Sequence, residues 1–181
     1  MEIICVLGTP GAGKTTEAEL LAKYLDCPWF SMGELIRAKA TGQDRQDMLD
    51  GKIIDDTVTM RFVDEAIASV ETKAKQCIFE GNPRRIPQVD WWLAQVKSGR
   101  FKIKGIIHLS VDPAIASERL NKRGRIDDAS DHVVEKRLAE YKRFITPTLD
   151  YLKQHDIPIH ELSANGTIEE VADQIHKVLG L

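Results

Sequence analysis

The stretch "VLGTPGAGKTTEA" near the N-terminus constrains the fold of this chain more than any other part of the sequence. It follows an apolar run at residues 3–7 and leads into a helical pattern that begins near Ala18. It matches the pattern G-x-x-x-x-G-K-[ST], whose defining positions are Gly8, Gly13, Lys14 and Thr15. The glycines of such a loop let backbone N–H groups turn toward phosphate oxygens, and the following helix adds the positive end of its dipole. The stretch therefore predicts a strand, a phosphate-binding loop and a helix, in that order.

Apolar runs alternate with helical patterns along the rest of the chain. The runs expected to form strands are residues 3–7, 28–30, 77–79, 106–109 and 157–162. Helix starts are legible after two of them, because Asp112 precedes Pro113 and Thr167 pairs with Glu170 as a capping box. Strands that alternate with helices predict a parallel sheet covered on both faces. We expect an α/β fold with a five-stranded parallel sheet of the P-loop NTPase type, whose ligands bind beyond the carboxyl ends of the strands.

Composition excludes several kinds of partner. The chain has 181 residues, of which 43% are hydrophobic, so it can form one domain with its own core. Its formal net charge of −3 gives no strongly basic surface for nucleic acid or an acidic membrane. No apolar stretch approaches the ~20 residues of a membrane span, and no basic segment followed by an apolar run opens the chain. We expect a cytoplasmic monomer with no nucleic-acid or membrane partner.

Two polar segments interrupt the alternation of strands and helices. Residues 40–52 and 121–131 are charged, contain glycine, and leave the sheet pattern before returning to it. Polar, glycine-containing segments are usually solvated surface loops. Their position after motifs at strand ends also makes them candidate lids.

Arginines are concentrated around these segments. Arg84 follows the run at 77–79, Arg37 lies in "FSMGELIR", and others surround the second polar segment: Arg119, Arg123, Arg125 and Arg137. Phosphoryl transfer needs positive charge around the transferred group, and the planar guanidinium fork suits phosphate oxygens. A GTP-switch protein is excluded, because "NKRG" at 121–124 has glycine where the base-reading motif N-K-x-D needs aspartate.

The motifs together resemble the adenylate kinase family of nucleoside monophosphate kinases. "FSMGELIR", "DGKIIDD", "FEGNPRRIPQ" and "KRGRIDD…EKRLAEY" fall in the order and spacing of that family, and the likeness covers nearly the whole chain. The resemblance implies a single domain, 1–181, with a short nucleoside monophosphate-binding insertion at 31–55 and a short lid at 121–131. It implies transfer of a phosphoryl group from ATP to a nucleoside monophosphate, with Mg²⁺ as cofactor.

The loop motif and the resemblance together imply the residues of the site. Those expected to bind ATP are Gly8, Pro10, Gly11, Ala12, Gly13, Lys14, Thr15, Thr16, Arg119 and Gly166. Those expected to bind AMP are Met32, Arg37, Ile54, Gly81, Arg84, Gln88, Arg125 and Arg137. Catalytic roles are expected for Lys14, Arg84, Arg123, Arg125 and Arg137. Mg²⁺ is expected at the Thr15 hydroxyl, with Glu80 orienting it through water.

Three substitutions depart from the family pattern, and two of them bear on the choice of substrate. Thr15 replaces the usual glycine after the loop lysine, Met32 replaces a threonine near the acceptor base, and Asn82 replaces a phenylalanine. Gln88 favours AMP as acceptor, whereas Met32 and Asn82 leave CMP, UMP or a deoxynucleotide open. A nucleotide-binding regulatory protein with little turnover is the alternative outside the enzymes. A kinase for a metabolite other than a nucleotide would leave "FEGNPRRIPQ" without a role.

Overall fold

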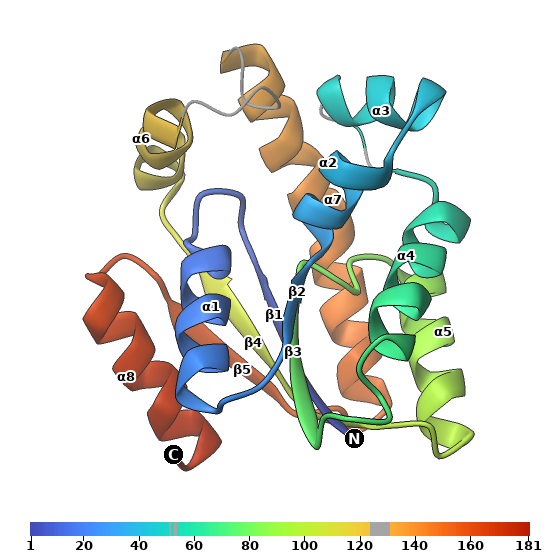
Figure 1. Cartoon of the computed structure of the whole chain (residues 1–181). Coiled ribbons are helices and arrows are strands. Elements are labelled where there is room, and N and C mark those ends of the chain that lie inside the picture. Colours follow the sequence, from blue (N-terminus) through green and yellow to red (C-terminus); the bar gives the residue numbers. More distant parts are fainter. Residues whose placement is uncertain (51, 53, 124–130) are drawn as a thin grey trace.

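The structure, a computed structural model, describes residues 1–50, 52, 54–123 and 131–181, and the side chains of Arg123, Asp131 and Val133 fall outside the description. Its centre is one five-stranded sheet with the order β2-β3-β1-β4-β5 (Figure 1). The strands are β1 (Glu2–Gly8), β2 (Trp29–Ser31), β3 (Gln76–Glu80), β4 (Lys102–Ser110) and β5 (Ile159–Ser163). Every neighbouring pair is parallel, as the alternating pattern predicted.

Helices connect the strands. They are α1 (Lys14–Tyr24), α2 (Met32–Lys39), α3 (Gly42–Leu49), α4 (Asp56–Ala68), α5 (Ile86–Lys97), α6 (Pro113–Arg123), α7 (Asp131–Gln154) and α8 (Ile168–Leu179). The predicted capping box is present at α8, where Thr167 accepts from the backbone N–H of Glu170 and the Glu170 carboxylate accepts from that of Thr167. The predicted start of α6 at Pro113 is also confirmed.

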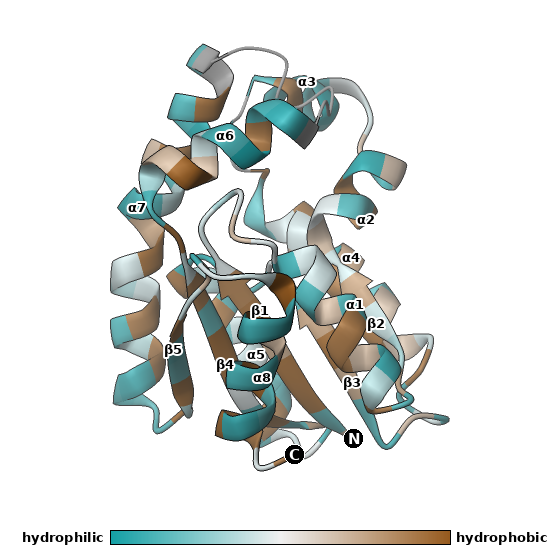
Figure 2. Cartoon of the chain, turned by 90° about the vertical axis from the view of Figure 1, so that its left-hand side faces the viewer, coloured by the Kyte–Doolittle hydropathy of each residue, from teal (hydrophilic) through white to brown (hydrophobic). Residues whose placement is uncertain are grey.

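The alternation of β1 side chains divides the core into two layers. Ile4 and Val6 pack with buried residues of α1 and α8, whereas Ile3, Cys5 and Leu7 pack with α4, α5 and α7. Successive side chains of a strand point to opposite faces, so one apolar run supplies both layers. Hydrophobic strands are thus enclosed by helices whose outer surfaces are hydrophilic (Figure 2). Cys5 and Cys77 are buried free thiols within these strands.

The first polar segment is folded differently from a surface loop. Residues 42–49 form α3, a helix with no buried residue. Side-chain hydrogen bonds one turn apart support it, from Gln43 Nε2 to Asp47 Oδ1 and from Gln46 Nε2 to Asp50 Oδ1, each 2.9 Å long. Such pairs stabilise a helix without an apolar face, which is why the hydrophobic pattern gave no signal for α3. Of the second segment, residues 124–130 lie outside the described residues.

No helix among the described residues is long and apolar enough to cross a membrane.

Candidate active site

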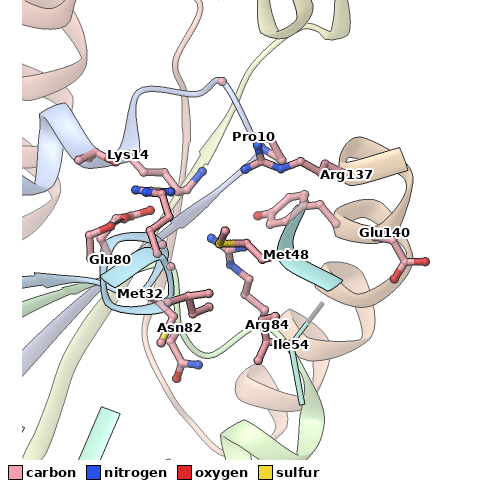
Figure 3. A pocket seen from close by; sticks show the side chains of 18 of the residues that line it. Pro10, Lys14, Met32, Met48, Ile54, Glu80, Asn82, Arg84, Arg137 and Glu140 are labelled. Atoms are coloured by element: carbon pink, nitrogen blue, oxygen red, sulfur yellow. Dashed lines mark hydrogen bonds between the residues drawn. The ribbon is translucent and has the colours of Figure 1, made fainter. Parts of the chain in front are cut away.

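A cavity of about 340 Å³ lies at the carboxyl ends of β1, β2 and β3. We call it the main cavity. Its walls come from the phosphate loop, α2, the end of β3 and α7, so it forms where the parallel sheet predicted a ligand site. Lys14 and Glu80 lie on one side of it and Arg137 on the other, with Arg84 between them (Figure 3). The predicted residues that line it are Pro10, Gly11, Gly13, Lys14, Thr15, Thr16, Met32, Arg37, Ile54, Glu80, Gly81, Arg84, Gln88, Arg119 and Arg137.

The phosphate loop joins β1 to α1 through backbone conformations that favour glycine. Gly11 has a φ of 85°, and a Cβ atom there would lie 2.7 Å from the carbonyl oxygen of Ala116. Gly8 does not line the main cavity. It lies under the loop, where a Cβ atom would be 2.3 Å from the Leu109 carbonyl oxygen. These close approaches pack the loop against β4 and α6.

Two features of the loop suit an anion. Lys14 is buried, and its ammonium group donates a 2.9 Å hydrogen bond to the backbone carbonyl of Thr9, which holds it against the loop. Gly13 precedes the first turn of α1, and no side chain of the described residues caps that turn. The backbone N–H groups of a helix N-terminus and a nearby ammonium group together favour phosphate.

A second cavity of about 280 Å³ lies on the other side of the loop, and we call it the second cavity. Arg119 of α6 closes one side by donating to the carbonyl oxygens of Ala164 (2.9 Å) and Gly166 (3.4 Å). The predicted residues Ala12 and Gly166 line this cavity and not the main one. Gly13, Thr16 and Arg119 line both. The two cavities are therefore adjacent across the phosphate loop.

Two arginines of the main cavity lie against glycines. Gly81 has a φ of 87°, and a Cβ atom there would come within 2.8 Å of Arg84 Nη2. A Cβ atom on Gly33 would lie 3.3 Å from Arg37 Nη1. Each guanidinium thus occupies space that a larger residue would fill, which places positive charge from two separate segments in one cavity. Arg137 adds a third guanidinium from α7.

Gln88 is held by hydrogen bonds that fix the orientation of its amide group. Its Oε1 accepts from Asn82 Nδ2 (2.9 Å) and from the backbone N–H of Arg84 (2.7 Å). Its Nε2 donates to Asp56 Oδ1 at 2.8 Å. Because a backbone N–H can only donate, the atom that meets Arg84 N must be the amide oxygen. With Oε1 engaged twice, Gln88 retains one N–H to offer to the main cavity.

Asn82 connects this arrangement to the core. Its Oδ1 accepts from the indole N–H of Trp92 at 2.7 Å, and both side chains are buried. Trp92 packs edge-on to Phe79 of β3 and to Phe101, and so anchors α5 to the core. Asn82 therefore ties the Gln88 amide to the rigid centre of the molecule.

Glu80 and Thr15 supply oxygen atoms to the same cavity. Glu80 is buried at the end of β3, where the Ser31 hydroxyl donates a 2.5 Å hydrogen bond to its carboxylate. Mg²⁺ prefers such hard oxygen ligands and is usually held by one or two of them together with substrate phosphates. The described residues contain no cluster of three or more His, Cys, Asp or Glu side chains for a metal. Glu80 and Thr15 thus fit Mg²⁺ carried by a nucleotide better than an ion in an all-protein site.

A buried pair of side chains behind the loop has no counterpart among the sequence motifs. Tyr141 of α7 lines the main cavity, and its hydroxyl lies 3.0 Å from His108 Nε2 of β4. Burial raises the pKa of Tyr141 and lowers that of His108, so both are neutral near pH 7. His108 thereby has a structural role, as a fixed partner for a cavity-lining phenol.

Other residues of the site were missed or fall outside the description. Ser31, Glu17 and Asp56 belong to the site, although the sequence analysis assigned them no role. The available signals were that Glu17 follows the phosphate loop, that Ser31 lies in "FSMGELIR" and that Asp56 ends "DGKIIDD". Arg125 lies outside the described residues, and only the backbone of Arg123 is described. The binding and catalytic roles of these two residues, like those of the other site residues named from the sequence, remain predictions.

Comparisons with known proteins agree with this arrangement. The family model described as adenylate kinase matches residues 6–157. The adenylate kinase of Corynebacterium urealyticum is 31% identical over 176 residues, which cover 94% of each chain. That of Rhodococcus erythropolis is 31% identical over 183 residues, covering 98% of each chain, and that of Parasynechococcus marenigrum is 29% identical over 179 residues, covering 96% of each. With the sheet order, the phosphate loop and the two adjacent cavities, these matches show that the chain belongs to the adenylate kinase family.

Proposed function

We propose that this chain is a phosphotransferase that moves the γ-phosphoryl group of Mg-ATP to AMP and releases two molecules of ADP. The observation that carries the proposal is the pair of cavities that meet at the phosphate loop, with Gly13, Thr16 and Arg119 common to both. A transfer between two nucleotides needs two binding places with the transferred group between them. Membership of the adenylate kinase family supports the same reaction.

The donor would occupy the second cavity and the loop. Its base would lie beside Arg119 and Gly166, and its phosphates would meet the N–H groups of the α1 N-terminus and the Lys14 ammonium. Arg37 and Arg84 would hold the phosphate of the acceptor in the main cavity. Arg137, together with Arg123 and Arg125, would neutralise the charge that spreads over the transferred group.

The chain needs no general base for this reaction, because the attacking oxygen of the acceptor phosphate is already an anion. Its tasks are to hold two polyanions in line and to keep water from the transferred group. Thr15 and Glu80 would hold Mg²⁺, the glutamate through water. When bound, Mg²⁺ supplies positive charge to the donor phosphates.

The fixed amide of Gln88 supports a base with a bare ring nitrogen. Its remaining N–H can donate to N1 of adenine or N3 of cytosine, which carry no hydrogen. Guanine N1 and uracil N3 each carry a hydrogen, so they would oppose one donor with another. Gln88 therefore favours AMP, and CMP is the second candidate acceptor that this observation allows.

The test is the rate of ADP formation from Mg-ATP with AMP, CMP, UMP, GMP or dAMP, and with no acceptor. We expect selective turnover with AMP. A preference for CMP would keep every phosphate role and change only the base assignment. ATP hydrolysis without an acceptor, or no turnover with any acceptor, would contradict the proposed function.

A further inference from the structure

Asn82 is a buried polar residue of the main cavity to which the proposed function gives no role. It follows the end of β3, lines the cavity, and has a side chain that is only 1% exposed. The indole N–H of Trp92 can only donate, so the Asn82 atom that meets it at 2.7 Å must be Oδ1. The amide group of Asn82 is thereby fixed with its Nδ2 toward Gln88.

The hydrogen bond from Asn82 occupies an acceptor position that a base would otherwise meet. An amide oxygen can accept two hydrogen bonds. Gln88 Oε1 accepts one from the backbone N–H of Arg84 at 2.7 Å and one from Asn82 Nδ2 at 2.9 Å. Both positions are filled before a nucleotide enters, so Gln88 offers the cavity a donor and no acceptor.

This arrangement limits what the amide can read on an adenine base. The edge of adenine presents N1, a ring nitrogen that accepts, next to a 6-amino group that donates. An amide with a free oxygen would meet both groups, with its N–H on N1 and its oxygen on the amino group. Gln88 meets only N1, because its oxygen is engaged twice.

Apolar side chains form part of the remaining wall of the main cavity. They include Met32, Ile36, Met48 and Ile54. Met32 lies against the turn that leads to Asn82, since a Cβ atom on Gly81 would be 3.5 Å from Met32 Cβ, and Figure 3 shows Met32 and Asn82 on the same side of the cavity. An apolar wall gives an amino group no acceptor, and flexible methionine side chains adapt to a small change in the shape of the base.

We propose that Asn82 is a positioning residue that makes the acceptor site read the ring nitrogen of the base and not its amino group. By filling the second acceptor position of Gln88, it lets the site take a further class of substrate, the purine nucleoside monophosphates that have a bare N1 and no 6-amino group. This inference rests on the proposed function, because it places the acceptor base at Gln88. Guanine stays excluded, since its N1 carries a hydrogen.

Two analogues of AMP separate the two contacts. Purine riboside 5′-monophosphate keeps N1 and has a hydrogen in place of the amino group, whereas 1-deaza-AMP keeps the amino group and has a C–H in place of N1. With Mg-ATP as donor, we expect kcat/KM for purine riboside 5′-monophosphate to lie within about threefold of that for AMP. For 1-deaza-AMP it should be about tenfold lower than for AMP, because a hydrogen bond to the base is lost.

Variants of the buried hydrogen bonds connect this preference to Asn82. Asn82→Leu combined with Trp92→Phe removes the donor to Gln88 together with the indole N–H that would otherwise be left unpaired, and replacing both partners by apolar groups is nearly neutral for stability. Gln88 Oε1 then keeps the Arg84 N–H and has a position for the 6-amino group. The preference for AMP over purine riboside 5′-monophosphate should rise by about fivefold.

Trp92→Phe alone is the matched control. It disturbs the same buried group but leaves the hydrogen bond from Asn82 to Gln88, so its preference should equal that of the unmodified chain. Equilibrium binding of AMP and of purine riboside 5′-monophosphate without ATP gives the same comparison independently of turnover. The analogues tested on the unmodified chain decide the main point even if the double variant does not fold.

The outcomes separate this inference from the proposed function. A larger preference for AMP over purine riboside 5′-monophosphate in the unmodified chain would mean that another group accepts from the amino group. That result would overturn the inference and leave the kinase intact, as would a folded double variant whose preference is unchanged. Absence of AMP-dependent ADP formation would overturn the proposed function, and the binding comparison would then decide on Asn82 by itself.

Discussion

The phosphate loop is shaped by its backbone, whereas the Gln88 end of the main cavity is shaped by buried side chains. In the loop, Gly11 and Gly13 take positive φ values, and Lys14 is held by the carbonyl of Thr9. At the other end, the orientation of one amide depends on Asn82, Asp56 and the Arg84 N–H. The first region comes from one continuous stretch, and the second joins groups from β3, α4 and α5 or next to them.

Substitutions in these two regions should have different effects. A loop built from backbone groups offers the same donors to any phosphate, so it secures binding and rate without choosing the nucleotide. A side-chain arrangement offers one donor in one direction, so it can discriminate between bases. Substitutions in the loop should therefore affect turnover with all acceptors, and those around Gln88 should affect the choice among them.

The largest expected effect is that of Lys14→Ala. Removing the ammonium group should lower kcat by at least about a thousandfold with every acceptor, because it stabilises charge on the transferred phosphoryl group. Steady-state kinetics measure the loss of kcat. A thermal unfolding curve measures the stability of the fold, which should change little. Lys23→Ala, an exposed lysine at the other end of α1, is the control. Near-normal turnover of Lys14→Ala would refute the assignment of the phosphate loop.

Asn82→Ala tests the buried hydrogen bonds that hold Gln88. It would leave the indole N–H of Trp92 without its partner and Gln88 Oε1 with one donor fewer. An unsatisfied buried donor costs about 1–3 kcal/mol, so the free energy of unfolding should fall by that amount. Urea denaturation measures the loss. An unchanged stability would mean that the Trp92 N–H finds another acceptor.

Gln88→Ala tests whether the fixed amide chooses the acceptor. It should lower kcat/KM for AMP by about tenfold, because one hydrogen bond to the base is lost. UMP should be affected less, since its N3 carries a hydrogen and gains nothing from the Gln88 donor. Gln95→Ala, on the same helix but outside the main cavity, is the matched control. Equal losses with AMP and UMP would remove the base-reading role.

The smallest effect concerns the stability of Glu17→Gln. The folded chain keeps the Glu17 proton up to about pH 7, whereas the unfolded chain releases it near 4.5. The folded state thus binds more protons between these values, and stability falls as pH rises through them. Glu17→Gln removes that loss, so it should be more stable than the unmodified chain at alkaline pH, by a fraction of the roughly 3 kcal/mol that the rise of the Glu17 pKa on burial from 4.5 to about 7 represents, and equally stable in acid. Denaturation curves of both proteins in acid and at alkaline pH measure this difference in stability. A less stable Glu17→Gln variant at alkaline pH would mean that Glu17 is stabilised as a carboxylate.

Much of the fold could be predicted from local sequence. The strand before the phosphate loop, the helix after it and the Thr167 capping box follow from residues close together in the chain. The helix α3 could not, because its polar residues carry no apolar period. Some element boundaries also differ from those predicted. The strand β4 begins at Lys102, four residues before the expected run, because it pairs with β1 from Glu2 onward.

Local sequence was enough to predict the class of fold, the phosphate loop and most of the residues around the main cavity. Glycine positions and apolar periods set backbone conformation locally, and a strand that continues into a helix brings the loop to the edge of the sheet. The orientation of the Gln88 amide depends on tertiary packing, and so does the burial of Glu17 Oε2, which has no hydrogen-bond partner among the described residues. Asp56 lies 32 positions before Gln88, and Gly166 lies 47 positions after Arg119, so these contacts exist only once the helices have packed. Hydrogen bonds and desolvation depend on that packing, because they are set by neighbours in space.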